Sequence, residues 1–257
     1  AGEIRFNDEN LPDLDERRMR KIRGKEIAMV FQDPMTSLNP LYTIQDQMEE
    51  VMKLHGDLSA EQRKNRCIEL LVEVGISQPE TRLKNYPHQF SGGMRQRVII
   101  AIALASNPKL VIADEPTTAL DVTIQAQILK LMRRLVKEHR TAMILITHDL
   151  AVVSEMTDQI LVMYCGRIVE KGTRDDIINR CQHPYTIGLL GSIPKLATRQ
   201  KRLRQIPGMV PNVMNLPPGC TFAQRCDYAR DRCRTNDPEL TALESGHKIA
   251  CFYPVKR

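Results

Sequence analysis

The sequence has no tryptophan, and aromatic residues make up only 4% of its 257 positions. Aliphatic side chains must therefore supply most of the hydrophobic core. Long apolar runs are missing as well, because a stretch such as 98–105 is far shorter than the ~20 residues that a membrane-spanning helix needs. The opening residues do not resemble a secretory leader. We therefore expect a cytosolic protein with no membrane span of its own.

A large excess of one charge is also missing, because 37 Lys and Arg stand against 31 Asp and Glu, with a net charge of +6. A basic balance can indicate binding to nucleic acid or to an anionic membrane. Here the basic residues alternate with acidic ones along the expected helices. We interpret the balance as an ordinary solvated surface and expect no nucleic-acid partner.

Apolar patterning predicts strands that alternate with helices. The longest helical pattern covers 42–86, where Ser59 and Gln62 have the spacing of a capping box and Gly75 is suited to end a helix. Alternation of this kind is typical of a mainly parallel α/β sheet, in which polar residues just past the strands face a ligand. We expect strands at 2–6, 27–31, 110–113, 143–146 and 160–163, and further helices at about 94–105 and 124–135.

Two adjacent carboxylates, Asp114 and Glu115, follow the apolar strand at 110–113. Nucleotide hydrolysis needs one acid to hold Mg²⁺, directly or through water, and a second carboxylate to orient the attacking water. Asp114 suits the first role and Glu115 suits the second. Taken alone, the segment is equally compatible with an Asp-Glu-Pro turn after any strand.

Other polar residues also follow an expected strand or begin an expected helix. Ser91, Gly92 and Gly93 begin an expected helix, where a hydroxyl and exposed backbone N–H groups suit an anion such as phosphate. Ser-Gly-Gly is also a common loop and helix cap. Gln32 and His148 each follow a predicted strand, although a lone histidine at a strand end is usually structural.

In their order along the chain, these segments resemble the motifs of the ATP-hydrolysing subunits of ABC transporters. The matching motifs are a Q-loop at Gln32, a signature at 90–97, a Walker B motif at 110–116, a D-loop at 118–121 and a switch histidine at His148. The resemblance implies a P-loop NTPase-like α/β core with a helical subdomain and a small Cys-rich C-terminal extension. It also implies ATP as the nucleotide and Mg²⁺ as its metal.

The resemblance gives each residue an expected role. It implies that Asp114 and Gln32 contact Mg²⁺. It further implies that Glu115, His148 and Gln32 act on the attacking water and the γ-phosphate. The signature is expected to contact the nucleotide of the opposite subunit. The residues implied to bind nucleotide are Ser91, Gly92, Gly93, Gln96 and Asp121.

Three segments, 31–40, 113–123 and 183–186, resemble the dipeptide and oligopeptide importer branch of that family, which also includes nickel importers. This implies peptide import powered by ATP, with a homologous ATPase subunit as heterodimer partner, two membrane permease subunits and, indirectly, an extracytoplasmic substrate-binding protein. The expected location is peripheral, on the cytoplasmic face of a bacterial inner membrane. Glutathione and antimicrobial-peptide systems share much of this pattern, so the transported substrate cannot be identified from the sequence.

One motif of the family is missing. No Gly-x-x-x-x-Gly-Lys-Ser/Thr loop occurs, and the Gly24-Lys25 pair is followed by Glu26, with Met19 where the first glycine would stand. In the family, a segment similar to 1–11 comes shortly after this loop, so we expect a sequence truncated before it. As written, the chain is expected to bind ATP poorly and to hydrolyse almost none, because the loop supplies most phosphate contacts.

The motifs divide the chain into four expected parts. These are a partial ATPase core at 1–32, a helical subdomain at 33–90, the remaining core at 91–173 and the importer-type extension at 174–257. The extension is rich in Pro, Gly and Cys, and four of the seven cysteines lie after residue 219.

Four thiols of the extension, Cys220, Cys226, Cys233 and Cys251, can hold a zinc ion or a [4Fe–4S] cluster, or can remain uncoordinated. Paired Cys-x-x-Cys knuckles, the usual sign of zinc, are absent. The family resemblance implies the iron–sulfur cluster. Such a cluster could staple a small domain without any redox role.

Two other classes of protein compete with the transport interpretation. Soluble ABC ATPases of DNA repair have similar motifs, but they need long coiled coils, and no sustained heptads appear between Gln32 and Ser91. A non-catalytic interaction subunit would explain the missing loop, but the presence of Glu115 and His148 argues against it.

Overall fold

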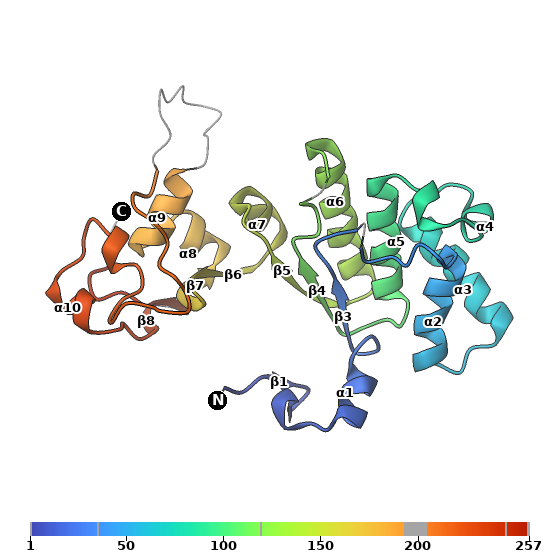
Figure 1. Cartoon of the computed structure of the whole chain (residues 1–257), viewed down its shortest axis with the longest axis horizontal. Helices are drawn as coiled ribbons and strands as arrows, with labels where there is room; N and C mark the ends of the chain where they lie inside the picture. Colours follow the sequence, from blue (N-terminus) through green and yellow to red (C-terminus); the bar gives the residue numbers. More distant parts are fainter. Residues whose placement is uncertain (1, 35, 119, 193–204, 245, 256–257) are drawn as a thin grey trace. The chain divides into compact units, whose positions relative to one another are not determined.

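The computed structural model describes residues 2–34, 36–118, 120–192, 205–244 and 246–255, which form two compact units, 1–148 and 149–257 (Figure 1). Met35, beside the predicted Q-loop, and Ala119, in the predicted D-loop, lie outside the described residues. The boundary predicted between residues 173 and 174 falls within the second unit, where a strand meets a helix.

The first unit is built on a parallel three-stranded sheet in the order β3-β4-β5. The strands are β3 (Ile27–Val30), β4 (Leu110–Asp114) and β5 (Ala142–Ile146). Val30 pairs with Ala113 and Asp114 pairs with Ile146, so the three strands end at the same edge of the sheet. The polar segments that follow these strands therefore emerge together, as the alternating pattern predicts.

Helices surround this sheet and continue into a helical region. α5 (Gly92–Leu104) packs against β3 and against α6 (Val122–Glu138), and its middle residues Val98, Ile99 and Ile100 are all buried. α6 is amphipathic and buries Ile128, Leu131 and Leu135, as its spacing predicts. The remaining elements of this unit are β1 (Arg5–Phe6), β2 (Glu9–Asn10), α1 (Glu16–Ile22), α2 (Ile44–His55), α3 (Ala60–Glu73) and α4 (Pro79–Arg82).

The ends of α3 follow the signals in its sequence. The Ser59 hydroxyl accepts a hydrogen bond from the Gln62 backbone, and the Gln62 side chain accepts one from Ser59 N, so the predicted capping box is confirmed. Gly75, just past the helix, has a φ of +76°, which places it in the left-handed region that favours glycine. The helix therefore ends where the sequence predicts.

The second unit corrects the expectation of a mainly parallel sheet. Its four strands are antiparallel in the order β6-β7-β9-β8. β6 and β7 form a hairpin through Cys165 and Gly166, with φ values of 48° and 78° as a tight two-residue turn requires. The strands are β6 (Gln159–Tyr164), β7 (Arg167–Thr173), β8 (Thr241–Glu244) and β9 (His247–Ile249). The helices are α7 (Leu150–Met156), α8 (Arg174–Ile178), α9 (Pro184–Gly191) and α10 (Asp231–Thr235).

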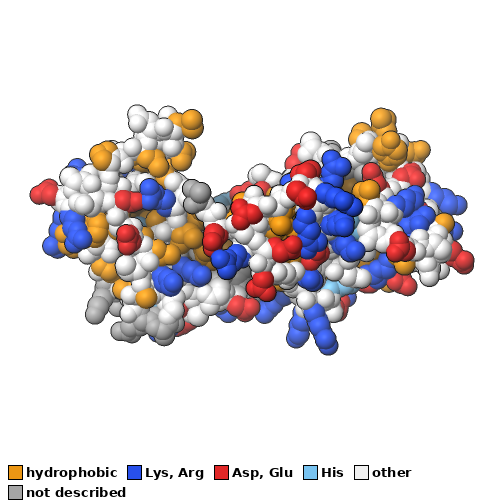
Figure 2. Space-filling view, turned by 90° about the horizontal axis from the view of Figure 1, so that it is seen from below, with side chains coloured by type: hydrophobic (Ala, Val, Ile, Leu, Met, Phe, Trp, Pro, Cys, Tyr) orange, Lys and Arg blue, Asp and Glu red, His pale blue; other side chains and the backbone are white. Residues whose placement is uncertain are grey.

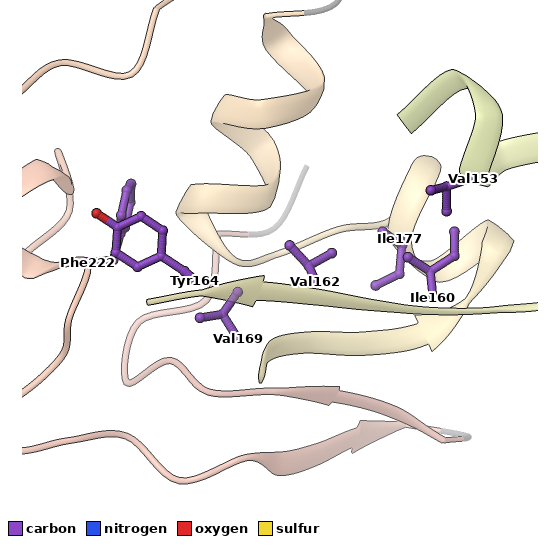
Figure 3. Close-up of a cluster of buried hydrophobic side chains, with 7 residues drawn as sticks. All are labelled: Val153, Ile160, Val162, Tyr164, Val169, Ile177 and Phe222. Carbon is purple, nitrogen blue, oxygen red and sulfur yellow. The ribbon is translucent and has the colours of Figure 1, made fainter. Parts of the chain in front are cut away.

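A small core holds the second unit together, and Figure 3 shows its side chains projecting from β6, β7, two helices and the segment that carries Phe222. The ring of Phe222 meets those of Tyr164 and Tyr185 edge-on, with centroids 5.3 Å and 5.4 Å away. Contacts between these aromatic rings bury apolar surface. The short, Pro-rich segment could not bury as much apolar surface with helices alone. The buried members are Val153, Ile160, Val162, Tyr164, Val169, Ile177 and Phe222.

Within the described part of the chain, every helix is too short or too polar to cross a lipid bilayer. On the face that Figure 2 displays, acidic and basic side chains lie interspersed. This distribution agrees with the interpretation of the net charge as an ordinary solvated surface.

Candidate active site and cysteine cavity

Three side chains meet at the carboxyl edge of the parallel sheet. Gln32 Nε2 donates to Glu115 Oε2 at 3.0 Å, and His148 Nδ1 lies 2.9 Å from Glu115 Oε1. Gln32 follows β3, Glu115 follows β4 and His148 follows β5. The parallel sheet thus gathers around one carboxylate three residues that are far apart in the sequence.

A tight turn aims the Glu115 side chain. Its φ of 43° lies in the left-handed region, which is uncommon for a residue with a Cβ and is frequent at functional sites. Its backbone N–H donates to Ile146 O at 2.9 Å, which ties the turn to β5. The Thr118 hydroxyl donates to Glu115 Oε2 at 2.7 Å. Thr118 was not among the residues expected to act here, although a threonine three residues after a turn carboxylate is a recognisable signal.

These contacts keep Glu115 ionised. The hydrogen bond from His148 is the main reason that the pKa of the Glu115 carboxyl lies below its ordinary value, and the contacts from Thr118 and Gln32 act in the same direction. The Glu115 side chain is 23% exposed and that of His148 is 76% exposed, so water and a ligand can reach the pair. The arrangement suits a carboxylate that orients a water molecule.

Asp114 is the last residue of β4 and is half-buried beside this group. The described residues contain no group of three or more His, Cys, Asp or Glu side chains that could hold a metal ion. Mg²⁺ bound to a nucleotide, however, takes only one or two protein carboxylates, with phosphate and water oxygens as its other ligands. Asp114, with the amide oxygen of Gln32, therefore fits the donor set for Mg²⁺.

The predicted signature forms the start of α5. Ser91 caps the helix by accepting a hydrogen bond from Met94 N at 3.4 Å, and both Ser91 and Gly92 are exposed. A Cβ on Gly93 would lie 2.8 Å from Ile124 Cγ2, so this position has no room for a side chain. The first backbone N–H groups of a helix have no partner within the helix, so an exposed helix start of this kind can accept an anion.

Two further residues of the expected site, Gln96 and Asp121, have different surroundings. Gln96 is fully buried, and neither its side-chain nitrogen nor its oxygen has a hydrogen-bond partner among the described residues. Asp121 caps α6 by accepting a hydrogen bond from Ile124 N at 3.0 Å. In this structure Gln96 is thus an interior residue, and the Asp121 carboxylate is occupied by its own helix.

Four of the six cysteines of the second unit, Cys220, Cys226, Cys233 and Cys251, line one cavity, together with His183 and Phe222. The loop around them is tight: Cys220 N donates to Cys233 O at 2.8 Å, and a Cβ on Gly219 would lie 2.5 Å from that oxygen. Burial raises the pKa of the Cys220 and Cys226 thiols, and it raises that of Cys251 to about 11. These thiols are therefore protonated near neutral pH unless a metal replaces the proton.

Sequence patterns pointed to the segment at 183–186, but they did not indicate the buried Glu170–His247 contact. His183 is 1% exposed, and the carboxylate of Glu170, which is fully buried, lies 2.9 Å from His247 Nε2. Glu170 and His247 are far apart in the chain, so only the folded structure brings them together.

The chain matches two described protein families. Residues 1–118 match the family "ABC transporter", and residues 169–233 match "Oligopeptide/dipeptide transporter, C-terminal region". Its sequence is 53% identical to the oligopeptide transport ATP-binding protein AppD of Bacillus subtilis (strain 168), over 98% of this chain and 76% of AppD. It is 49% identical to the dipeptide transport ATP-binding protein DppD of Escherichia coli (strain K12), over 99% of this chain and 78% of DppD.

Solved structures show the same architecture. One is a dimeric post-hydrolysis state of the ATP-binding cassette MJ0796 bound to ADP and Pi, with a TM-score of 0.60, 32% identity and coverage of 68% of this chain and 74% of that one. Another is cbiO1 from Clostridium perfringens, with a TM-score of 0.60, 29% identity and coverage of 69% and 68%.

The fold and the group around Glu115 are thus those of a nucleotide-hydrolysing cassette. The relatives define the branch: the chain belongs to the ATP-binding subunits of ABC transporters, in the group of the oligopeptide and dipeptide transporters.

Proposed function

We propose that this chain is the ATP-hydrolysing subunit that powers import of dipeptides or oligopeptides through a membrane permease. The observation that carries the proposal is the Glu115 carboxylate, held by Gln32, Thr118 and His148 at the carboxyl edge of a parallel sheet. The same chain is 53% identical to an oligopeptide transport protein and 49% identical to a dipeptide transport protein. Both names support peptides as the class of substrate.

Each residue around Glu115 has a different role in ATP hydrolysis. Asp114 and the Gln32 oxygen would hold Mg²⁺, which would neutralise charge on the phosphates when bound. Glu115 orients the attacking water, and His148 stabilises the Glu115 carboxylate, while the exposure of its ring leaves it accessible to a γ-phosphate. Ser91, Gly92 and Gly93 serve the nucleotide of a partner subunit, a role supported by the exposure of Ser91 and Gly92 at a helix start.

Nucleotide binding also needs a phosphate-binding loop, and no Gly-x-x-x-x-Gly-Lys-Ser/Thr motif is present in the sequence. The interpretation of the chain as a working ATPase subunit therefore assumes that such a loop completes the site. Any measurement of ATPase activity must therefore use a protein in which this phosphate-binding loop is present.

The proposed partners follow from the exposed signature and from the relatives. A homologous ATP-binding subunit pairs with this chain, and two permease subunits receive the work of the ATPase pair. A substrate-binding protein outside the membrane delivers the peptide. The chain itself then lies at the cytoplasmic face of the membrane as a peripheral subunit.

We further propose that the cysteine cavity binds a [4Fe–4S] cluster. Four thiols line one cavity and are the ligand type that such a cluster takes, although, as the described residues stand, no three of them form a group that could hold a metal ion. The chain's own contribution is to bring the C-terminal segment with Cys251 to the loop that carries Cys220, Cys226 and Cys233. The cluster would supply covalent staples there, and no redox step is assigned to it.

A chimera tests the transport function. The region of AppD that matches this chain is replaced by the chain, the rest of AppD is kept, and uptake of a labelled oligopeptide is measured in Bacillus subtilis cells that lack AppD. We expect the chimera to restore uptake and its Glu115→Gln variant to abolish it. Glu138→Gln, on the exposed end of α6, is the matched control and should transport normally. Equal uptake with Glu115→Gln would contradict the proposed role of this carboxylate.

Metal analysis tests the cluster. The chain is purified without oxygen, and its iron, zinc and acid-labile sulfide are measured together with its visible absorption. A [4Fe–4S] cluster gives about four iron and four sulfide per chain. One zinc per chain without sulfide, or no metal at all, would contradict the cluster and leave the ATPase function unaffected.

A further inference from the structure

Two arginines of the cysteine loop, residues 220–233, lie over aromatic rings of the C-terminal segment. The guanidinium carbon of Arg232 is 4.1 Å from the centre of the Phe252 ring, and that of Arg230 is 4.3 Å from the centre of the Tyr253 ring. Both distances are well inside the ~6 Å within which a cation is attracted to the face of an aromatic ring. We refer to these two contacts as the arginine clamp.

The clamp acts on the immediate neighbours of two cavity cysteines. Arg232 directly precedes Cys233 in the sequence. Phe252 directly follows Cys251. A contact between these neighbours keeps the backbones of the two cysteines near each other, because consecutive Cα atoms are only about 3.8 Å apart. Both thiols line the same cavity, and the rings of Phe252 and Tyr253 line it with them.

Backbone hydrogen bonds hold the C-terminal segment on either side of the clamp, but not at the clamp itself. Ala250 N and Val255 N each donate to a carbonyl at 2.9 Å, the first in β7 and the second in the segment before α9. Residues 251–254 form no backbone-to-backbone hydrogen bond with any residue that the structure describes. Of the hydrogen bonds, ion pairs and ring contacts between described residues, only those of the clamp join 251–254 to the cysteine loop.

The clamp lies at the surface and covers the two rings. Arg230 and Arg232 are exposed, whereas Phe252 and Tyr253 are half-buried. The long stems of arginine side chains can cover apolar surface while their charged ends remain in water. A single exposed contact between a cation and a ring is only moderately strong, so two of them on adjacent residues hold the segment better than one.

The cavity thiols are gathered, but they are not yet arranged around a metal. No three His, Cys, Asp or Glu side chains of the described residues form a group that could hold a metal ion. Binding of a group with four thiolate ligands would therefore require the thiols to move closer together. Three of them share the cysteine loop, whereas Cys251 comes from the segment after β9. Cys251 is thus the thiol whose place depends on a contact between separate segments.

We propose that the arginine clamp positions Cys251, so that its thiol stays in the cavity shared with the other three. Arg230 and Arg232 are positioning residues in this role and contact no reacting atom. The inference rests on the proposed four-thiolate site, but the clamp itself is a property of the metal-free chain. Without it, the segment around Cys251 is held only through its two ends, and the thiol leaves the cavity more often.

The test replaces both arginines of the clamp by glutamine, which is polar but uncharged. In the full chain, Arg230→Gln/Arg232→Gln is compared with wild type and with Arg234→Gln. Arg234 is exposed on the same helix and takes no part in the clamp, so its variant is the matched control. Arg230→Lys/Arg232→Lys keeps both charges without the planar guanidinium, and it serves as the conservative variant. Circular dichroism and thermal melting establish that each variant is folded.

The first readout is the alkylation rate of each cysteine in the metal-free, reduced chain, measured by peptide mass spectrometry. We expect Cys251 to react about tenfold faster in the glutamine variant, the effect of losing two exposed contacts, and about threefold faster in the lysine variant. Cys181, which is buried in the same unit outside the cavity, is the internal standard for a general loosening. Equal Cys251 rates in wild type and the glutamine variant, or the same increase in Arg234→Gln, would overturn the proposal.

A second set of variants tests whether the arginine acts through the ring. Phe252→Leu keeps an apolar side chain but removes the aromatic face. If the contact is the cause, Arg232→Gln should raise the Cys251 rate clearly less in the Phe252→Leu background than in wild type. An equal effect of Arg232→Gln in both backgrounds would show that the arginine acts without the ring, and it would contradict the clamp.

The last readout is the rate at which a chelator removes iron after anaerobic reconstitution with ferrous iron and sulfide. We expect iron loss to be about tenfold faster in the glutamine variant than in wild type or Arg234→Gln. If wild type takes up no iron while Cys251 reactivity still rises in the glutamine variant, the cluster fails and the positioning role stands. If both bind iron and lose it at the same rate, with unchanged Cys251 reactivity, the positioning role fails and the cluster stands.

Discussion

At the scale of single residues, Glu115 and Asp114 show how adjacent carboxylates acquire different tasks. Glu115 accepts hydrogen bonds through both oxygens, from donors that belong to separate loops. Asp114 stays on the strand, with its backbone in register with Ile146. A carboxylate with its oxygens already occupied suits the orientation of water, whereas one at a strand end suits a metal ion.

Exchange of each carboxylate for its amide should separate the two tasks. In the AppD chimera, Glu115→Gln is expected to lower the rate of ATP hydrolysis by about 10²–10⁴, the usual effect of losing a general base or a water-orienting group, while Mg-ATP still binds. Asp114→Asn is expected instead to weaken Mg²⁺-dependent nucleotide binding. Hydrolysis rates and nucleotide titrations with and without Mg²⁺ check both effects. If Glu115→Gln instead weakens Mg²⁺-dependent binding and Asp114→Asn instead lowers the rate of hydrolysis, the roles proposed for the two residues must be exchanged.

His148 should control the titration of Glu115. Because the folded pKa of Glu115 is depressed, its interactions stabilise the fold above the ordinary value of 4.5, and this contribution is lost as the pH falls through the folded value. In His148→Ala the pKa is expected to rise toward 4.5, and in Thr118→Val to rise by less. ¹³C NMR of labelled glutamate carboxyls measures the midpoint. His88→Ala, at an exposed histidine, is the control, and an unchanged Glu115 midpoint in His148→Ala would refute the contact.

The sequence predicted the position of a residue where that position depends on the end of a strand. It did not predict positions that depend on packing between distant segments. Parallel strands that end at one edge bring Gln32, Glu115 and His148 together, so their positions in the sequence were informative. The burial of Gln96 was not readable, because α5 is enclosed on nearly all sides and its polar residue does not mark a surface. The Glu170–His247 contact joins residues on two strands whose pairing was not predicted.

At the scale of elements, the end of α3 is held by arginines from two other helices. Arg97, on α5, donates to the carbonyl of Val74, and Arg134, on α6, donates to that of Glu73. Carbonyls at a helix end have no partner within the helix, so these guanidinium groups satisfy them and connect the helical region to the core. Gly75 makes this possible, because a Cβ there would lie 3.0 Å from Arg97 Nη1.

Substitution of two glycines should show this constraint. Gly75→Ala places a side chain at a φ of +76° and against Arg97, and it is expected to lower the free energy of unfolding by about 1–2 kcal/mol. Gly56→Ala, after α2, is the matched control, because its φ of −150° is open to any residue and the nearest atom lies 3.4 Å away. Urea unfolding followed by circular dichroism gives both values. Equal stability of the two variants would contradict the argument.

The elements that sequence patterns predicted were those with strong local signals. The capping box of α3 and the amphipathic face of α6 fall into this class. The hairpin of β6 and β7 was missed because Cys165, rather than a typical Asn or Asp, occupies a left-handed position of its turn. β8 and β9 were missed because their pairing with β7 is long-range and their segments are short.

At the scale of the whole molecule, the predicted signature is proposed to serve a nucleotide outside this chain. Ser91 and Gly92 are exposed at the start of α5, where the first backbone N–H groups have no partner within the helix and can accept an anion. The similar MJ0796 cassette is described as a dimer bound to ADP and Pi. A nucleotide held by the phosphate loop of a partner subunit would satisfy these groups, and this composite site does not need a phosphate loop in the present chain.

Association with such a partner should therefore depend on ATP and on Ser91. The chain is mixed with a homologous ATP-binding subunit that has an intact phosphate loop, and the complex is followed by analytical ultracentrifugation with and without Mg-ATP. Ser91→Arg is expected to abolish the ATP-dependent complex, because a long cationic side chain fills the space above the helix start. Ser77→Arg adds the same charge at an exposed serine between α3 and α4 and should leave association intact, while unchanged thermal melting shows that both variants fold. An ATP-dependent complex of undiminished affinity with Ser91→Arg would show that the signature does not face the partner's nucleotide.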